Sequence, residues 1–247
     1  MMQRRSKPGN SRINNGFKFL CPMLLFLFLF PFLYSLSTAA EIENPNPLRF
    51  KKEINRFSWQ DAKNTFSEQA ILFVGSSSIY TWKTAQAFPT LSVINRGFGG
   101  SQISDLNSYY DVVIKKYKPA RIIFYCGDND VAAGKDAAQI LTDFRAFMSR
   151  LKKDFPHTSL LFLAIKPSPL RWRLWNKMSQ TNRAIKNYCK NSGLCTFLDT
   201  ATPLLNSRGL PDKDLFVKDG LHLNADGYNI WNKLLTPCLM KGYNQQP

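Results

Sequence analysis

The sequence predicts an α/β protein: a three-layer α/β/α sandwich around a parallel sheet of five strands. Short apolar runs rich in β-branched and aromatic residues alternate with longer helical patterns along the chain. Such runs are typical of strands whose two faces are both covered by helices. The 247 residues suffice for one domain with a sizeable core. Right-handed crossovers between the strands give a doubly wound, flavodoxin-like arrangement.

Five apolar runs are the strand candidates, and they cover residues 71–74, 91–94, 121–125, 159–165 and 196–199. The predicted helices cover residues 102–117, 136–154, 171–191 and 224–241, and a leading helix includes 56–66. In an open parallel sheet, ligands bind at the carboxyl ends of the strands. We therefore expect the functional residues directly after the apolar runs.

Residues 1–40 differ in character from the rest of the chain. Residues 1–18 carry five basic side chains and no acidic one, and residues 19–40 carry no charge. A basic head, an apolar middle and a small-residue end are typical of an export signal, with cleavage after Ala40. The apolar run is also long enough to span a bilayer as an uncleaved anchor. The sequence does not separate these two interpretations, and both place the following domain outside the cytoplasm.

The remaining chain divides into a linker with a leading helix, residues 41–68, and the main domain, residues 69–243. The basic head supplies five charges of the formal net charge of +16, and the remaining +11 on residues 41–247 favours anionic surfaces such as lipid headgroups or acidic polymers. No motif of interleaved basic and aromatic residues indicates a nucleic-acid partner. The cysteines lack zinc-ligand spacing. Cys189 and Cys195 flank a helix–turn–strand junction and could form a disulfide outside the cytoplasm.

Small and polar residues follow the first strand, in the order Gly75-Ser76-Ser77-Ser78. Where a strand turns sharply into a helix, backbone N–H groups are left unpaired at the positive end of the helix dipole. A serine at that turn combines an exposed hydroxyl with donors for an anion, as a nucleophile in acyl transfer requires. The alternative is a serine that merely caps the helix.

Three further motifs follow the same logic. A glycine-rich turn that includes Gly100 follows the second strand, and a polar turn that includes Asn129 follows the third. Near the last helix, His222 stands three residues after Asp219, a spacing at which the carboxylate can fix the imidazole tautomer. Taken singly, these motifs are also compatible with ordinary turns and a capping aspartate.

Together, the four motifs resemble the SGNH hydrolases, also called the GDSL esterase/lipase family, and most closely the platelet-activating-factor acetylhydrolase-like branch. The resemblance spans about residues 69–240. It implies a triad of Ser77, Asp219 and His222, with an oxyanion hole formed by Ser77, Gly100 and Asn129. It implies neither metal nor cofactor. Ser76 and Ser78 depart from the aspartate and leucine usual beside the family nucleophile.

The resemblance implies hydrolysis of an ester through an acyl-serine. The domain is close to the minimum for this architecture, without an inserted lid, so we expect an open site suited to short acyl groups on a carbohydrate or lipid. Lys166, Arg171 and Trp172, in the loop after the fourth strand, are expected substrate contacts, although this loop could equally cap the next helix. The rival functions are an exported O-acyltransferase with the same triad and a non-catalytic binding module.

Overall fold

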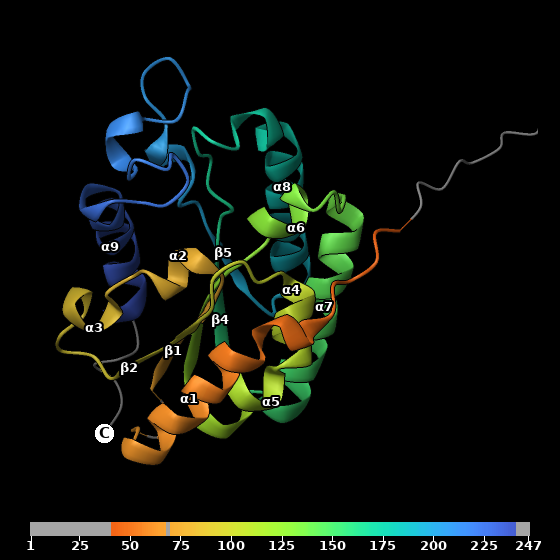
Figure 1. Cartoon of the computed structure of the whole chain (residues 1–247), viewed down its shortest axis with the longest axis vertical. Helices are drawn as coiled ribbons and strands as arrows, with labels where there is room; N and C mark the ends of the chain where they lie inside the picture. Colours follow the sequence, from red (N-terminus) through yellow and green to blue (C-terminus); the bar gives the residue numbers. More distant parts are fainter. Residues whose placement is uncertain (1–40, 68–69, 241–247) are drawn as a thin grey trace, which may run out of the picture. The chain divides into compact units, whose positions relative to one another are not determined.

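The computed structural model describes residues 41–67 and 70–240, and it confirms the predicted three-layer architecture (Figure 1). The five strands are parallel and lie in the order β2-β1-β3-β4-β5. They are β1 Ile71–Gly75, β2 Val93–Gly97, β3 Arg121–Tyr125, β4 Ser159–Leu163 and β5 Thr196–Leu198.

Successive side chains of each central strand enter different cores. Leu72 and Val74 of β1 belong to one buried cluster, while Ile71 and Phe73 belong to the other. This two-residue alternation follows from strand geometry, which points neighbouring side chains to opposite faces. Because both faces of the central strands β1, β3 and β4 are covered, these strands are almost entirely apolar, and the sequence shows them as apolar runs.

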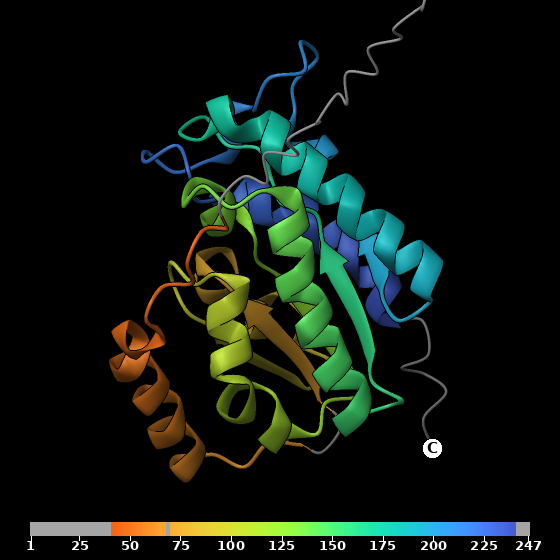
Figure 2. The same ribbon diagram turned by 90° about the vertical axis from the view of Figure 1, so that its right-hand side faces the viewer.

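The helices form the two outer layers. One layer contains α1 (Lys51–Lys63), α4 (Ile103–Ser108), α5 (Tyr110–Val113), α7 (Ala137–Asp154) and α8 (Trp175–Ser192). The other contains α2 (Ser77–Tyr80), α3 (Thr84–Ala87) and α9 (Ala225–Met240). Figure 2 shows α7 and α8 in front of the sheet and the blue α9 behind it. The strands end at the upper edge in both views, where α2 and α6 (Asp128–Ala132) begin.

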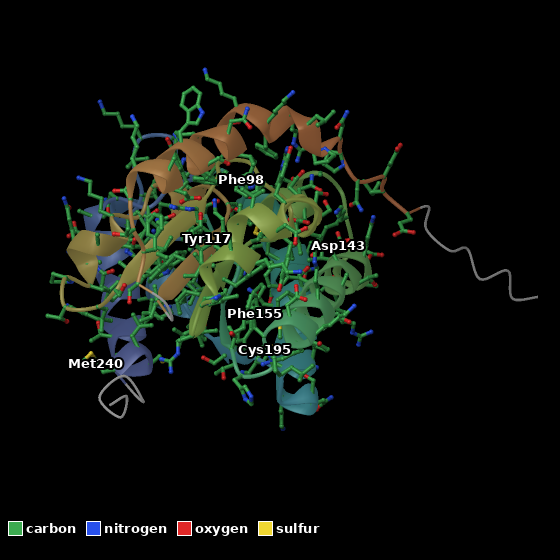
Figure 3. The ribbon with its side chains drawn as sticks, turned by 90° about the horizontal axis from the view of Figure 1, so that it is seen from below. Phe98, Tyr117, Asp143, Phe155, Cys195 and Met240 are labelled. Carbon is green, nitrogen blue, oxygen red and sulfur yellow. A yellow bond between two sulfur atoms is a disulfide. The ribbon has the colours of Figure 1, made fainter. Side chains whose placement is uncertain are left out.

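The leading segment packs onto the domain. A short 3-10 helix, η1 (Pro47–Phe50), runs into α1, and Figure 3 shows the labelled Phe98 next to the orange α1 ribbon. The aromatic rings of Phe50 and Phe57 lie 5.0 and 6.4 Å from the ring of Phe98. Before it, the side chain of Asn44 accepts a hydrogen bond of 2.6 Å from the buried Lys135. The predicted linker is thus tied to the domain from its first residues.

The fourth strand ends at Leu163 rather than at residue 165, and the leading helix ends at Lys63 rather than at residue 66. Two further elements differ more from the sequence prediction. The second strand begins at Val93 rather than at residue 91 and continues through Asn95 and Arg96. Polar residues fit there because β2 is an edge strand and both side chains have partners. Asn95 donates to the Ile79 carbonyl at 2.7 Å, and the guanidinium of Arg96 donates to the carboxylate of Asp61 at 2.5 Å. The helix predicted over residues 102–117 is three short pieces, α4, α5 and η2 (Lys115–Tyr117). The run of β-branched residues at 112–114 disfavours a continuous helix.

The structure joins Cys189 and Cys195 in a disulfide at the end of α8, the pairing that the sequence left open. The predicted export signal or anchor, residues 1–40, lies outside the described residues. Within residues 41–67 and 70–240, no helix combines the length and apolar character needed to cross a bilayer.

Candidate active site

The serine triplet lies at the turn between β1 and α2. Ser76 is the N-cap of α2 in an extended conformation, and Ser77 is the first residue of the helix. Ser76 is 0% exposed and Ser78 is 1% exposed, whereas Ser77 is half-buried. The middle hydroxyl is therefore the one open to a ligand, at the position where the family resemblance expects the nucleophile.

Helix α9 holds this turn in place. The hydroxyl of Tyr228, in the first turns of α9, donates to the carbonyl of Ser78 at 2.8 Å and lies 2.7 Å from the hydroxyl of Thr81. Thr81 in turn donates to the carbonyl of Ser77 at 2.9 Å. Because α9 begins three residues after His222, these bonds link the serine turn to the segment that carries the histidine.

The glycine-rich turn after β2 packs against the serine turn. A Cβ on Gly97 would lie 2.4 Å from the backbone nitrogen of Tyr80, so only glycine permits this approach. One on Gly99 would lie 3.9 Å from the Cβ of Ser77. Gly100 has a φ of +80°, a conformation that other residues rarely adopt. The turn therefore runs beside Ser77.

Asn129 extends from the first turn of α6, which follows β3. Its Nδ2 donates to the carbonyl of Ser101 at 3.0 Å, directly beside the glycine turn. The next residue, Asp130, is fully buried and accepts the backbone N–H of Ile103 at 3.1 Å. These two bonds tie α6 to the exit of the glycine turn. The sequence shows Asp130 only as an acidic residue in a turn, and it does not indicate that this side chain links α6 to the glycine turn.

His222 and Asp219 occupy the loop before α9. Oδ2 of Asp219 lies 2.6 Å from Nδ1 of His222, so the carboxylate accepts that proton and leaves Nε2 as the basic nitrogen. Partial burial opposes ionisation of Asp219, but hydrogen bonds from the His222 ring and backbone outweigh it and lower the pKa to about 2. The backbone of His222 is itself fixed, because its carbonyl accepts the N–H of Val217 at 2.9 Å.

Lys166 has a different place from the one expected. It is 1% exposed, and its ammonium group donates to the carbonyl of Leu221 at 2.7 Å. Burial lowers its pKa to about 8, although nearby carboxylates oppose this. An enclosed ammonium group does not reach a ligand, so Lys166 supports the His222 loop instead of contacting substrate.

The other two expected substrate contacts lie at the start of the next helical segment. Arg171 is 19% exposed, and its guanidinium contacts Asn129 and Asp128. Trp172 is half-buried and begins η3 (Trp172–Leu174), with its ring stacked on that of Trp175 at 6.1 Å. The loop thus leads directly into the next helical segment, in agreement with the alternative role suggested from the sequence, the capping of that helix.

The arrangement leaves a set of unpaired polar atoms. Among residues 41–67 and 70–240, the backbone N–H groups of Ser77 and Gly100 have no hydrogen-bond partner. The same is true, within that part of the chain, of the Ser77 hydroxyl and of Nε2 of His222. Free enzymes commonly lack the hydrogen bond between nucleophile and base that tightens once substrate is present. Free donors next to an accessible hydroxyl are the elements of acyl transfer.

A family model supplies the deciding observation. The model described as the GDSL-like lipase/acylhydrolase family matches residues 75–230, more than half of the chain. The chain belongs to this family. It is therefore a serine hydrolase that acts on ester bonds, and the resemblance inferred from the four motifs is confirmed.

Solved structures share the fold of this GDSL-like hydrolase. A protein named as a platelet activating factor, from Streptococcus pneumoniae, has 23% identity and a TM-score of 0.70 over 78% of this chain and 94% of its own. A GDSL-like lipase from Bacteroides thetaiotaomicron has 19% identity and a TM-score of 0.67, covering 76% and 98%. A catalytic mutant of an acetylxylan esterase from Geobacillus stearothermophilus has 16% identity and a TM-score of 0.59, covering 70% and 94%. No curated protein matches the chain.

Proposed function

We propose that this GDSL-like hydrolase removes short acyl groups, acetyl foremost, from a carbohydrate through an acyl-enzyme on Ser77. The observation that carries the acyl-enzyme chemistry of this proposal is the 2.6 Å contact between Asp219 and His222, which leaves Nε2 of the imidazole free as a base. The half-buried Ser77 lies at the β1–α2 turn, which Tyr228 of α9 holds in place through its hydrogen bond to the Ser78 carbonyl.

In the first half of the reaction, Nε2 of His222 takes the proton of the Ser77 hydroxyl as its oxygen attacks the ester carbon. Asp219 stabilises the imidazolium that forms. The oxyanion accepts the backbone N–H groups of Ser77 and Gly100 and the Nδ2 group of Asn129. The imidazolium then protonates the leaving alcohol oxygen as the C–O bond breaks.

In the second half, water attacks the acyl-serine with His222 again as base. The serine leaves with the proton returned to it, and a carboxylic acid is released. Each oxyanion donor typically contributes about 3 kcal/mol to the transition state. No step calls for a metal or a cofactor.

The surroundings of the site support a small acyl group and a polar alcohol. Within the described residues 70–240, every helix and strand belongs to the sandwich or to a short connection between its elements, and no lid domain is inserted among them. A groove of about 550 Å³ lies between α3, α9 and the loop that precedes α9. Its lining combines polar side chains such as Gln86 and Asn229 with apolar and aromatic ones such as Trp82 and Leu223. Ser77 and His222 do not line this groove, but Thr81 and Tyr228, which do, form hydrogen bonds to the serine turn. The amide and hydroxyl groups can bind the hydroxyls of a sugar, and the aromatic rings can lie against its ring faces.

An ester panel tests this proposal. The purified protein is assayed on p-nitrophenyl acetate, butyrate and octanoate and on an acetylated xylo-oligosaccharide, with Ser77→Ala as control. We expect the highest kcat/KM for the acetate, at least tenfold above the octanoate, and release of acetate from the sugar. A preference for octanoate would indicate a lipid esterase. Mass spectrometry of added acceptor sugars detects transfer, and acylated acceptors in place of free acetate would identify a transferase.

We further propose that residues 1–40 direct the enzyme out of the cytoplasm, as a cleaved signal or a membrane anchor. The support is the basic head, the uncharged run and the small residues up to Ala40. Expression of the full chain in a bacterial host, followed by fractionation and intact-mass measurement, tests this. A soluble exported product that begins at Glu41 indicates cleavage, a full-length membrane fraction indicates an anchor, and a soluble cytoplasmic product contradicts both.

A further inference from the structure

The carboxamide of Asn129 serves an oxyanion in only one of its two orientations. Its Nδ2 end carries two donor hydrogens, whereas its Oδ1 end is an acceptor of nearly the same size. A carboxamide turned by 180° would present an oxygen to a developing negative charge. The proposed chemistry therefore depends on neighbours that distinguish the two ends.

The neighbours of Asn129 make that distinction. Nη1 of Arg171 lies 3.0 Å from Oδ1, and a guanidinium has donors only, so it accepts nothing from an amide nitrogen. On the other side, Nδ2 donates to the carbonyl of Ser101 at 3.0 Å, and a carbonyl only accepts. Both contacts match one orientation, and turning the amide would break both.

Arg171 is itself held firmly. Its Nη1 lies 3.2 Å from Oδ2 of Asp128, whose side chain is 4% exposed, so the guanidinium also neutralises an enclosed carboxylate. Its backbone N–H donates to the hydroxyl of the buried Ser168 at 3.3 Å.

The loop that carries Arg171 is also fixed to the other half of the site. The backbone N–H of Leu170 donates to the carbonyl of Gly220 at 2.9 Å, next to Asp219. Lys166, at the start of the same loop, binds the carbonyl of Leu221. The segment 166–171 thus spans from the loop of the acid–base pair to the carboxamide of Asn129.

We propose that Arg171 is a positioning residue, whose guanidinium holds the carboxamide of Asn129 with its NH₂ group directed to the oxyanion. This inference rests on the proposed acyl-serine mechanism. It replaces the expected role of Arg171 as a substrate contact. A contact to substrate would act mainly on KM, whereas a residue that orients an oxyanion donor acts on kcat.

The test is a double-mutant cycle on p-nitrophenyl acetate with the full-length protein. Arg171→Met should lower kcat between tenfold and a hundredfold with KM within about twofold, since one oxyanion donor is worth about 10²–10³ in kcat. Asn129→Ala removes the donor itself and should lower kcat by about 10²–10³. In the Asn129→Ala background, Arg171→Met should cost less than about twofold further, because the group that it orients is gone.

Two controls keep the outcome interpretable. Arg173→Met removes an exposed arginine two residues further along and should leave kcat and KM unchanged. Because Arg171→Met leaves Asp128 without its cation, the cycle is repeated on an Asp128→Asn background, where no buried charge is stranded. Circular dichroism confirms that each variant is folded.

Three results would overturn the proposal: an unchanged kcat in Arg171→Met, an effect confined to KM, or full multiplication of the two losses in the double variant. Failure of the mechanism itself is separate and visible elsewhere. If Ser77→Ala keeps parental activity, the acyl-serine proposal is wrong. If Ser77→Ala is inactive while the Arg171 and Asn129 effects multiply, only the positioning role is wrong.

Discussion

Both carboxylate oxygens of Asp219 are bound to the His222 segment: Oδ2 lies 2.6 Å from Nδ1 of the imidazole, and Oδ1 accepts the backbone N–H of His222 at 2.9 Å. Oδ1 also accepts the N–H of Leu221 at 2.8 Å. One side chain thus fixes both the ring and the backbone of the base. The spacing of three residues makes this possible, because it returns the chain over the carboxylate in a tight turn.

Replacing Asp219 by asparagine should therefore lower activity without unfolding the protein. An asparagine can still accept the two backbone bonds, but it lacks the negative charge that stabilises the imidazolium and favours the correct tautomer. We expect kcat/KM on p-nitrophenyl acetate to fall by about two to four powers of ten. Asp226→Asn, which changes an exposed aspartate of α9, is the control and should match the parent. Loss of less than tenfold in Asp219→Asn would contradict this role.

The serine triplet offers a sharp comparison of three neighbouring hydroxyls. Ser76 and Ser78 are enclosed, whereas Ser77 is half-buried at the start of α2. Ser76→Ala and Ser78→Ala should keep kcat within a few-fold of the parent, because neither hydroxyl reaches a ligand. Ser77→Ala should lose several powers of ten. Steady-state kinetics on the three variants show which hydroxyl is the nucleophile. An inactive Ser78→Ala with the circular dichroism spectrum of a folded protein would contradict the assignment to Ser77.

Two glycines beside the nucleophile should respond differently to alanine. In Gly97→Ala the new Cβ would lie 2.4 Å from the Tyr80 nitrogen, so the turn must move and stability should fall by about 3 kcal/mol or more. In Gly100→Ala no atom lies within 4 Å of the Cβ, and only the φ of +80° is strained, at about 1–2 kcal/mol. Urea unfolding measures both. Equal costs would contradict the packing described for these turns.

Stability should depend on pH through the buried Asp130. Burial raises its pKa to about 7, although the ammonium of Lys135, 3.6 Å away, opposes this. The folded state therefore holds a proton that the unfolded chain releases near pH 4. The resulting stabilisation is complete below about pH 4 and is lost as the pH rises through about 7. Relative to Asp130→Asn, the parent should lose stability over this window, on the order of a few kcal/mol.

Urea titrations at half-unit pH steps measure this difference, with Glu43→Gln, an exposed residue outside any helix or strand, as control. The free energy of unfolding of the control should follow that of the parent at every pH. A parallel course for Asp130→Asn and the parent would show that Asp130 has an ordinary pKa in the folded state.

The parts of the molecule that the sequence predicts are those encoded by local pattern. The central strands are buried on both faces, so the sequence shows them as apolar runs. The Asp219–His222 pair depends only on a spacing of three residues. The sequence places the edge strand β2 two residues too early, because Asn95 and Arg96 interrupt its apolar run. Both side chains bind partners distant in the chain. Periodicity carries no information about such partners.

The loop after β4 shows the same limit within the site. Lys166 stands in a proline-rich polar loop that is typical of exposed segments, yet it is enclosed because Leu221, from another loop, accepts its hydrogen bond. The contact of Arg171 with Asn129 joins residues 42 apart in sequence. Long-range pairs of this kind follow from topology, and one sequence contains no signal for them.

The most direct test of the central claim is covalent labelling of the intact enzyme with a fluorophosphonate, followed by peptide mapping and fragmentation. This reagent phosphonylates an activated serine, and the tryptic peptide 64–83 contains the whole triplet. We predict one equivalent of label on Ser77, and no label in Ser77→Ala. Label on another serine, or an active enzyme that takes up no label at Ser77, would contradict the account.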